Sequence, residues 1–243
     1  MSKRLDQACI EYFSTRAKAQ DAIKAGRVKV NKKTIMKCSY LVKEEDVIEI
    51  EKKEVEFVSR AYEKLDCALK AFSIDLKDKV VLDIGASTGG FTQACLQAKA
   101  KKVYALDVGH LQLDPILDQD HRVVKMEGHN AREIMASWFD EPIDFICMDV
   151  SFISAKTILD HVFSVLNVEK IVVLVKPQFE CGPQALNKKG VLKNPNLRKK
   201  ILDDMDRYFR QFYERVDWID SPIKGRSGNL EALAYLHHKR PNI

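Results

Sequence analysis

The sequence predicts an α/β protein: a mostly parallel, Rossmann-like sheet with helices on both faces, preceded by a small basic α+β unit. Apolar strand-like segments alternate with helical segments through most of the chain, a pattern typical of parallel sheets covered on both faces. A glycine-rich turn follows the first of these strands, as in nucleoside-binding folds. The basic residues are concentrated near the N-terminus, which indicates a separate unit there.

The 243 residues suffice for one large domain, or for a large domain with a small one. Residues 1–53 carry 13 lysines and arginines against 8 acids, which leaves 27 of each in the remainder and places the whole excess of +5 in this first segment. A small basic unit favours a polyanionic partner. We place the first domain at 1–52, a linker at 53–60, where the residues are mostly charged or polar, and the second domain at 61–243.

Other classes of protein are not expected from the composition. The six scattered cysteines form no C-x-x-C pair, so we expect reduced thiols and neither a metal site nor a disulfide framework. No apolar run approaches the roughly 18 residues of a membrane span, and the N-terminus lacks the apolar core of a signal peptide. We therefore expect a cytoplasmic protein without stable membrane association. The sequence does not indicate an oligomeric state.

Helical spacing of apolar residues predicts a helix over 3–12, followed by a second helix that ends at Gly26. Residues 27–30 and 47–50 have the pattern of short strands. The basic residues of this unit cluster around the helix pair and the turn that follows it. They are Arg4, Arg16, Lys18, Lys24, Arg27, Lys29, Lys32 and Lys33.

Such a charged run usually forms a solvated face. Here only Asp6, Glu11 and Asp21 interrupt it through Lys37, and this shortage of acids favours a surface that binds the RNA backbone.

The second domain begins with a helix over 61–72. Lys64 lies beside the apolar stripe of this helix, and from this spacing alone we expect its side chain to face solvent. A buried strand and a tight turn follow, over Val80–Phe91. Gly85, Gly89 and Gly90 allow the backbone of this turn to take positive φ and to lie close to a ligand.

The strand before the turn contains Asp83, and a second apolar strand ends at Asp107, close to the spacing expected for an acid that holds a ribose diol. The turn lacks the G-x-G-x-x-G spacing of dinucleotide sites, and an acid at the strand end suits the cationic amino-acid part of S-adenosylmethionine better than a pyrophosphate. An ordinary strand-to-helix turn is the alternative.

Further strands are predicted near 122–126, 143–149, 171–176, 216–219 and 232–236. Asp83, Asp107, Asp149 and Lys176 then all lie at the carboxyl edge of the sheet, where ligand chemistry gathers in such folds. Lys176 with Asp149 can take the proton of a ribose 2′-hydroxyl, or stabilise the alkoxide that develops there, without a metal.

Other polar residues are ambiguous. Asn130 follows the third strand and is either an adenine contact or a turn residue. The basic residues at 188–189 and 198–200 are either a solvated face or contacts to a phosphate backbone. His237 and His238 have no partner at ligand spacing, which indicates a surface position.

Several motifs of the first 50 residues resemble a known RNA-binding module. They are Arg-Leu-Asp-Gln-Ala, Ser-Thr-Arg-Ala-Lys-Ala-Gln and Ile-Lys-Ala-Gly-Arg-Val-Lys-Val-Asn. The module is the alpha-L RNA-binding domain named after a small-subunit ribosomal protein, which also occurs in pseudouridine synthases and tRNA synthetases. The resemblance therefore implies RNA binding but no particular reaction.

The rest of the chain resembles the TlyA, or hemolysin A, family of FtsJ-like ribosomal RNA 2′-O-methyltransferases. The motifs that carry this resemblance are Leu-Asp-Ile-Gly-Ala-Ser-Thr-Gly-Gly-Phe-Thr, Tyr-Ala-Leu-Asp-Val-Gly, Asp-Val-Ser-Phe-Ile-Ser, Val-Lys-Pro-Gln-Phe-Glu and Gly-Asn-Leu-Glu. FtsJ-like enzymes use a Lys-Asp-Lys-Glu tetrad, which the resemblance assigns to Lys64, Asp149, Lys176 and Glu231.

The resemblance also assigns the positions that bind S-adenosylmethionine. They are Asp83, Gly85, Ala86, Ser87, Thr88, Gly89, Gly90, Phe91 and Asp107. We add Asn130 and Asp149 as candidate cofactor contacts, because each follows a predicted strand at the same edge of the sheet. One departure from the family pattern is Ala61, where many relatives have a glycine after Ser-Arg.

The resemblance implies transfer of a methyl group to a cytidine 2′-hydroxyl in ribosomal RNA, with the RNA or a ribosomal subunit as the partner. The extent of the chain matches the shorter subgroup, which is associated with the large subunit. Two alternatives remain open. One is a pore-forming hemolysin, which needs an apolar membrane element, and the other is an RNA-binding assembly factor that keeps the cofactor pocket without catalysis.

Overall fold

The computed structural model describes residues 2–13, 16–51, 57–225 and 227–241, together with the backbone but not the side chain of Ala17. The chain divides into two compact units, 1–56 and 57–243, with separate hydrophobic cores. The division falls within the segment predicted as a linker, of which 53–56 lie outside the described residues.

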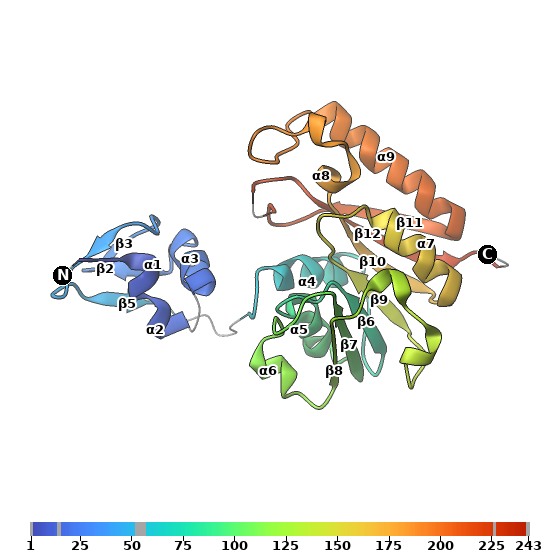
Figure 1. The fold of residues 1–243 in the computed structure, drawn as a ribbon, viewed down its shortest axis with the longest axis horizontal. Helices are drawn as coiled ribbons and strands as arrows, with labels where there is room; N and C mark the ends of the chain where they lie inside the picture. The colour runs from blue at the N-terminus through green and yellow to red at the C-terminus, as the bar shows by residue number, and fades with distance from the viewer. Residues whose placement is uncertain (1, 14–15, 52–56, 226, 242–243) are drawn as a thin grey trace. The chain divides into compact units, whose positions relative to one another are not determined.

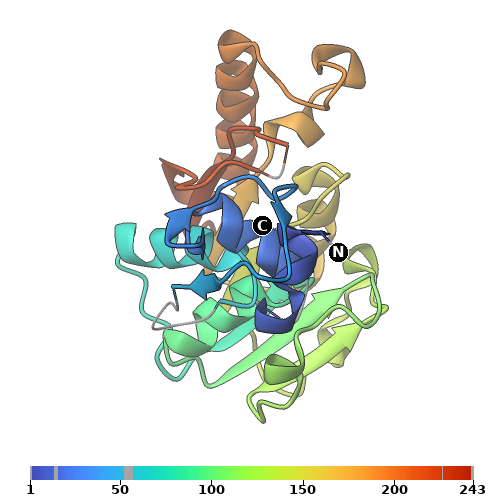
Figure 2. The same cartoon turned by 90° about the vertical axis from the view of Figure 1, so that its left-hand side faces the viewer.

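The N-terminal unit combines short helices with short antiparallel strands (Figures 1 and 2). Strand β2 pairs with both β3 and β5, and β1 pairs with β4. Leu5, Phe13, Ile23 and Val28 belong to the buried core that joins helices and strands. The elements of this unit are β1 (Lys3–Arg4), α1 (Leu5–Ala8), α2 (Ile10–Phe13), α3 (Arg16–Lys24), β2 (Val28–Val30), β3 (Lys33–Thr34), β4 (Leu41–Val42) and β5 (Ile48–Ile50).

The prediction of one helix over 3–12 is wrong in two respects: the segment begins as a strand, and the rest forms two short helices. Lys3 and Arg4 form a strand, because their backbones pair with Val42 and Leu41 far along the chain. The helix is also interrupted at Cys9, which is fully buried and separates α1 from α2. Periodicity within ten residues cannot reveal a pairing partner nearly forty residues away.

The larger unit contains one seven-stranded sheet, in the order β11-β12-β10-β9-β6-β7-β8. Strands β8, β7, β6, β9 and β10 are mutually parallel, and β12 is antiparallel to both of its neighbours. The strands are β6 (Val80–Ile84), β7 (Lys102–Asp107), β8 (Val123–Glu127), β9 (Phe145–Met148), β10 (Lys170–Val175), β11 (Tyr213–Asp220) and β12 (Ala232–Lys239).

Helices cover both faces of this sheet (Figure 1). Leu82 and Ile84 of β6 belong to the core with α7 and α9, whereas Val81 belongs to the core with α4 and α5. The alternation along one strand explains why β6 is apolar at nearly every position. The helices are α4 (Ala61–Ala71), α5 (Gly90–Gln97), α6 (Pro115–Asp118), α7 (Ala155–Val165), α8 (Pro177–Glu180) and α9 (Pro195–Phe212), with 3-10 turns at Ala131–Glu133, Ala136–Trp138 and Pro183–Ala185.

The chain reverses its direction of winding between β6 and β9. Strands β7 and β8 follow on one side of β6, whereas β9 and β10 follow on the other. Ligands bind at such switch points, outside the carboxyl ends of the strands. Among the described parts of the chain, none of the helices combines the length and apolar composition that a membrane crossing needs.

Candidate active site

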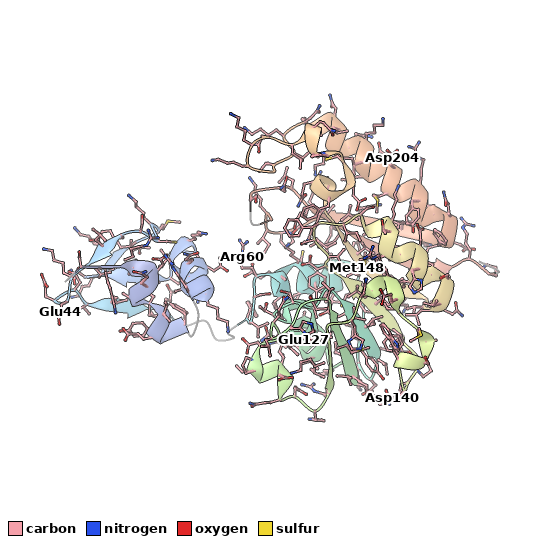
Figure 3. The ribbon with its side chains drawn as sticks, viewed as in Figure 1. Glu44, Arg60, Glu127, Asp140, Met148 and Asp204 are labelled. Atoms are coloured by element: carbon pink, nitrogen blue, oxygen red, sulfur yellow. The ribbon has the colours of Figure 1, made fainter. Side chains whose placement is uncertain are left out.

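Three of the predicted tetrad residues lie at one edge of the sheet because of the strand directions. Asp149 directly follows β9 and Lys176 directly follows β10, which is parallel to β9. Glu231 directly precedes β12, whose first residue pairs with the last residue of β10. The start of an antiparallel strand therefore lies beside the ends of two parallel strands. Figure 3 labels Met148, which ends β9 at this edge.

Lys176 and Asp149 form a close ion pair. The Lys176 Nζ lies 2.5 Å from Asp149 Oδ1, and it donates a hydrogen bond to Ser151 Oγ at 2.7 Å. The side chains retain only 10% and 15% of their exposure, so water screens this pair weakly. An ammonium has three hydrogens, and the hydrogen bond to Ser151 leaves hydrogens for Asp149 and for a ligand.

Lys64 and Glu231 form a second buried ion pair. The Lys64 Nζ donates to Glu231 Oε2 at 2.6 Å, with side-chain exposures of 10% and 3%. Gln178 donates from Nε2 to the other carboxylate oxygen at 3.1 Å. Lys64 is therefore buried and paired with Glu231, and the prediction from periodicity of a solvent lysine is wrong. The helical pattern places it beside the apolar stripe but cannot show that Glu231 lies opposite.

The glycine turn after β6 packs directly on the loop that carries Asp149. Gly85 has a φ of +84°, and a Cβ at this position would lie 2.5 Å from the backbone oxygen of Asp149. Gly89 has a φ of +91°, in the left-handed region that favours glycine. The turn thus needs glycine partly to approach its own protein neighbours, and the cofactor half of the predicted site adjoins the Asp149–Lys176 pair.

Asp107 is tied to this turn. Its Oδ2 accepts from the backbone N–H of Ser87 at 2.8 Å, and its Oδ1 accepts from Gly109 at 2.7 Å. Glu127, labelled in Figure 3 and located at the end of β8, accepts the backbone N–H groups of residues 111–113. These hydrogen bonds to the charged form lower the pKa of Glu127 and fix the loop that follows Asp107.

Asp83 is fully buried rather than open at the strand end. Its Oδ2 accepts from Thr92 Oγ1 at 2.7 Å, and the Cys147 thiol is a further side-chain hydrogen-bond partner of the carboxyl group. Burial raises the pKa of Asp83 to about 7, and the nearby Asp149 charge adds to this effect. A buried carboxylate under a glycine turn, with a second carboxylate at the next strand end, fits a ligand that carries both an ammonium and a ribose diol.

Asn130 has a local structural role. Its Oδ1 accepts from the backbone N–H of Arg132, and its Nδ2 donates to Glu133 Oε1. It therefore caps the 3-10 turn after β8, which agrees with the turn alternative for this residue.

Two arginines of the N-terminal unit, Arg4 and Arg16, are held by one buried acid, Asp6. Asp6 accepts two hydrogen bonds from Arg4, at 3.0 and 3.1 Å, and one each from Arg16 and Gln20, at 3.0 and 2.7 Å. These donors hold the pKa of Asp6 well below its usual range. Arg4 and Arg16 remain 41% and 47% exposed, so their guanidinium groups are fixed yet accessible.

The other predicted RNA contacts differ in accessibility. Lys24, Lys32 and Lys33 are exposed, and Lys18 and Lys29 are half-buried. Arg27 is also half-buried and lies over the ring of Phe13, 5.8 Å from its centroid.

Several polar residues of the site were missed by the sequence interpretation. Ser151 and Gln178 each follow a tetrad residue by two positions within motifs that carry the resemblance. Thr92 and Glu127 give no signal of their own, because their roles depend on contacts with separate strands and loops. Asp6 was counted only as an interruption of the basic run.

The sheet order and the polar groups at its switch point define the class of protein: a methyltransferase with a Rossmann-like fold. A family model described as FtsJ-like methyltransferase matches residues 57–238, and one described as S4 domain matches residues 3–48. The chain belongs to the TlyA, or hemolysin A, family of FtsJ-like methyltransferases, and its N-terminal unit is an S4 domain.

Individual relatives match almost the whole chain. Hemolysin A of Brachyspira hyodysenteriae is 44% identical, with 92% of this chain and 94% of that protein covered. The protein of Mycobacterium tuberculosis named 16S/23S rRNA (cytidine-2′-O)-methyltransferase TlyA is 36% identical, over 91% of this chain and 84% of its own. A solved structure from Streptococcus thermophilus, provisionally named a hemolysin, has a TM-score of 0.75 at 35% identity and covers 98% of this chain and 88% of its own.

Proposed function

We propose that this protein transfers a methyl group from S-adenosylmethionine to the 2′-hydroxyl of a cytidine in ribosomal RNA of the large subunit. The observation that carries the proposal is the pair of buried ion pairs, Lys176–Asp149 and Lys64–Glu231, at the sheet edge beside the glycine turn. The M. tuberculosis relative, whose name gives this reaction for both ribosomal RNAs, supports the substrate class. A ribosomal substrate would place the protein in the cytoplasm.

The cofactor residues follow from the geometry of the turn. Asp107 would hold the ribose hydroxyls, since a carboxylate that already accepts two N–H groups still has lone pairs for further donors. The 85–91 turn would hold the amino-acid end, with the buried Asp83 beneath it, where the charge of an ammonium would favour the ionised form of Asp83. When bound, the cofactor supplies a methyl group activated on a sulfonium.

Lys176 and Asp149 would act on the acceptor hydroxyl. A ribose hydroxyl is a weak nucleophile because its proton must leave as the new O–C bond forms. The remaining N–H of Lys176 would bind the 2′-oxygen and stabilise the negative charge that develops on it. The proton would pass to the Asp149 carboxylate, because the Lys176 ammonium has no lone pair to accept it, and the partial burial of the pair strengthens these interactions.

Lys64 and Glu231 would form the second wall of the acceptor site. Glu231 holds the Lys64 ammonium, and Gln178 holds Glu231, so the lysine has a fixed orientation with hydrogens left for the substrate. The S4 domain would supply RNA affinity through its basic residues, because phosphate contacts position a nucleic acid without reading its sequence.

The test of the proposal is methyl transfer by a Lys176→Ala variant. We expect it to lose at least about a hundredfold in kcat, because one donor to the developing oxyanion is removed. Cofactor affinity should be retained. Lys170→Ala is the matched control, because Lys170 is an exposed lysine at the opposite end of β10.

The measurement is incorporation of labelled methyl groups into unmodified ribosomal RNA, followed by mapping of the methylated ribose. Full activity of a pure Lys176→Ala protein would remove this lysine from the mechanism. Cofactor binding by the wild-type protein without transfer to any ribosomal precursor would favour an assembly factor instead.

A further inference from the structure

Six basic residues follow α8 in a stretch that contains no acid. Between Cys181 and Leu202 the sequence has six lysines and arginines and neither aspartate nor glutamate. We define residues 186–200 as the basic segment. Its six cations are Lys188, Lys189, Lys193, Arg198, Lys199 and Lys200.

The tip of the basic segment is a built turn. Asn187 Oδ1 accepts from the backbone N–H groups of Lys189 and Val191, at 2.8 and 3.0 Å, and an antiparallel bridge joins Leu186 to Leu192. Lys188 and Lys189 are exposed on this turn. The turn therefore presents two adjacent cations from a fixed backbone.

The basic segment is attached to the strand start that carries Glu231. Asn229, only 4% exposed, accepts from the Leu192 N–H and donates to the Gly190 oxygen, both at 2.9 Å. Arg198 Nε donates to the Leu230 oxygen at 3.3 Å. These contacts fix the segment within a few residues of one of the buried ion pairs.

Most cations of the segment are not neutralised within the protein. Arg198 pairs with Asp220 and Lys199 with Asp203. No ion pair to Lys188, Lys189, Lys193 or Lys200 is found in the part of the chain that the structure describes. Elsewhere in this unit some exposed lysines have acidic partners, as in Lys70–Asp66, Lys101–Glu141 and Lys125–Asp118, whereas others, such as Lys77, Lys99 and Lys170, have no ion pair among the described residues. What distinguishes the basic segment is that four such lysines lie within 13 residues of one another.

The position of the cations on α9 is also unfavourable for the helix itself. Arg198, Lys199 and Lys200 lie near the N-terminus of α9, and its first turn contains no acid. The helix dipole is positive at this end and its effect falls off within the first turn, so it opposes chiefly Arg198, by about 0.3–1 kcal/mol. Because no acid in the first turn offsets the positive helix end, and Lys200 has no ion pair among the described residues, this end of α9 suits an external anion.

We propose that the basic segment is a second RNA-binding surface, on the methyltransferase unit itself, which holds the phosphate backbone next to the acceptor site. The proposal rests on the proposed function for the identity of the polyanion. A groove of about 700 Å³ lies beside the segment, lined by the cations Lys193, Arg198, Lys199 and Arg207 and also by the acids Asp203, Asp206 and Asp220. The exposed lysines of the segment, and not this groove, therefore carry the proposed RNA contacts. The segment would fix the register of the RNA strand, while the S4 domain supplies affinity at a separate place.

The test is a charge-neutralised triple variant of the full chain, Lys188→Gln/Lys189→Gln/Lys193→Gln. The matched control is Lys77→Gln/Lys99→Gln/Lys170→Gln, which removes the same charge from three exposed lysines near the starts of β6, β7 and β10. The probe is large-subunit ribosomal RNA transcribed in vitro, and binding is measured at several salt concentrations.

We expect the triple variant to bind this RNA on the order of tenfold more weakly than the control, with a log–log salt slope smaller by about 2, for three lost phosphate contacts. Its KM for RNA should rise while its affinity for S-adenosylhomocysteine and its melting temperature match those of the control.

The two proposals fail in different ways. Equal RNA affinity and equal salt slope in the triple variant and the control would overturn the inference, even where wild-type methyl transfer is intact. A loss of binding to phosphatidylglycerol vesicles in the triple variant, with RNA binding unchanged, would assign the surface to a membrane instead and also overturn it. Absence of methyl transfer by the wild-type protein would overturn the proposed function alone, because the RNA affinities are measured without turnover.

Discussion

Asp6 shows how one buried side chain can organise an exposed surface. Its negative charge lowers the net positive charge of a basic unit, yet it accepts hydrogen bonds from two arginines and a glutamine. Both arginines keep much of their surface accessible. Because their guanidinium groups are held in fixed positions, less conformational entropy is lost when they bind phosphates.

We predict that Asp6→Asn weakens RNA binding by roughly tenfold, about 1.4 kcal/mol. Net charge alone predicts tighter RNA binding, since the substitution removes a negative charge from a unit that binds a polyanion. The positioning effect should dominate because the asparagine can no longer hold both arginines with charge-assisted hydrogen bonds. The measurement is the dissociation constant for ribosomal RNA in the full chain.

Glu11→Gln is the control for this prediction. Glu11 is exposed in the same unit, and it forms no ion pair among the residues that the structure describes. We expect its RNA affinity to be unchanged or slightly higher. Tighter binding by a folded Asp6→Asn protein, checked by its melting temperature, would show that the acid only opposes the RNA.

At the scale of elements, the contact between α4 and α5 determines where Lys64 lies. Gly90 begins α5, and a Cβ there would lie 2.3 Å from Ser59 Oγ, 2.8 Å from the Ala61 Cβ and 2.9 Å from the Tyr62 nitrogen. The glycine therefore allows α5 to pack against the first turn of α4, the helix that carries Lys64.

Replacing Gly90 by alanine should destabilise the protein by about 1–3 kcal/mol through overpacking. Helix propensity predicts the opposite, a gain of about 1 kcal/mol. A displaced α4 would also misplace Lys64, so we expect kcat to fall. Denaturant unfolding and methyl-transfer kinetics measure the two effects.

Gly190→Ala provides the comparison. Gly190 has a φ of +71° and open space around it, so only backbone strain of about 1–2 kcal/mol is expected. Its kcat should stay near that of the wild-type protein. A Gly90→Ala protein as stable and active as the wild type would show that the helices adjust without cost.

Most elements of the larger unit were predictable, but those of the smaller unit were less so. The strand and glycine turn over 80–91 combine an apolar run with residues that permit positive φ, and both signals are local. Strand β1 was missed because its pairing with β4 is not local. The resemblance named the tetrad, but only the structure shows which lysine pairs with which acid.

At the scale of the whole molecule, the two units have separate cores and should unfold separately. Leu5, Ile23 and Val28 belong to one core, whereas the seven-stranded sheet is packed between two others. We predict two thermal transitions in calorimetry. S-adenosylhomocysteine should raise the transition temperature of the larger unit only. At a concentration of 100 Kd, binding adds about 2.7 kcal/mol to the free energy of unfolding of that unit.

Asp107→Ala is the control for this assignment. It removes the carboxylate proposed to hold the ribose, so the ligand-induced shift should shrink while both transitions persist. A single transition that the ligand shifts as a whole would show that the units unfold together, and it would place the domain boundaries predicted here in doubt.

The sequence by itself determined the α/β class, the glycine turn, the basic N-terminal unit and, through resemblance, the family. These features depend on local periodicity, on residue types that permit particular backbone angles, and on contiguous motifs. Only the tertiary structure decided the pairing of Lys64 with Glu231, the burial of Asp83 and the attachment of the basic segment to Asn229. Each of these depends on strands and helices that are far apart in the sequence. Only the packed sheet brings their side chains within hydrogen-bond distance.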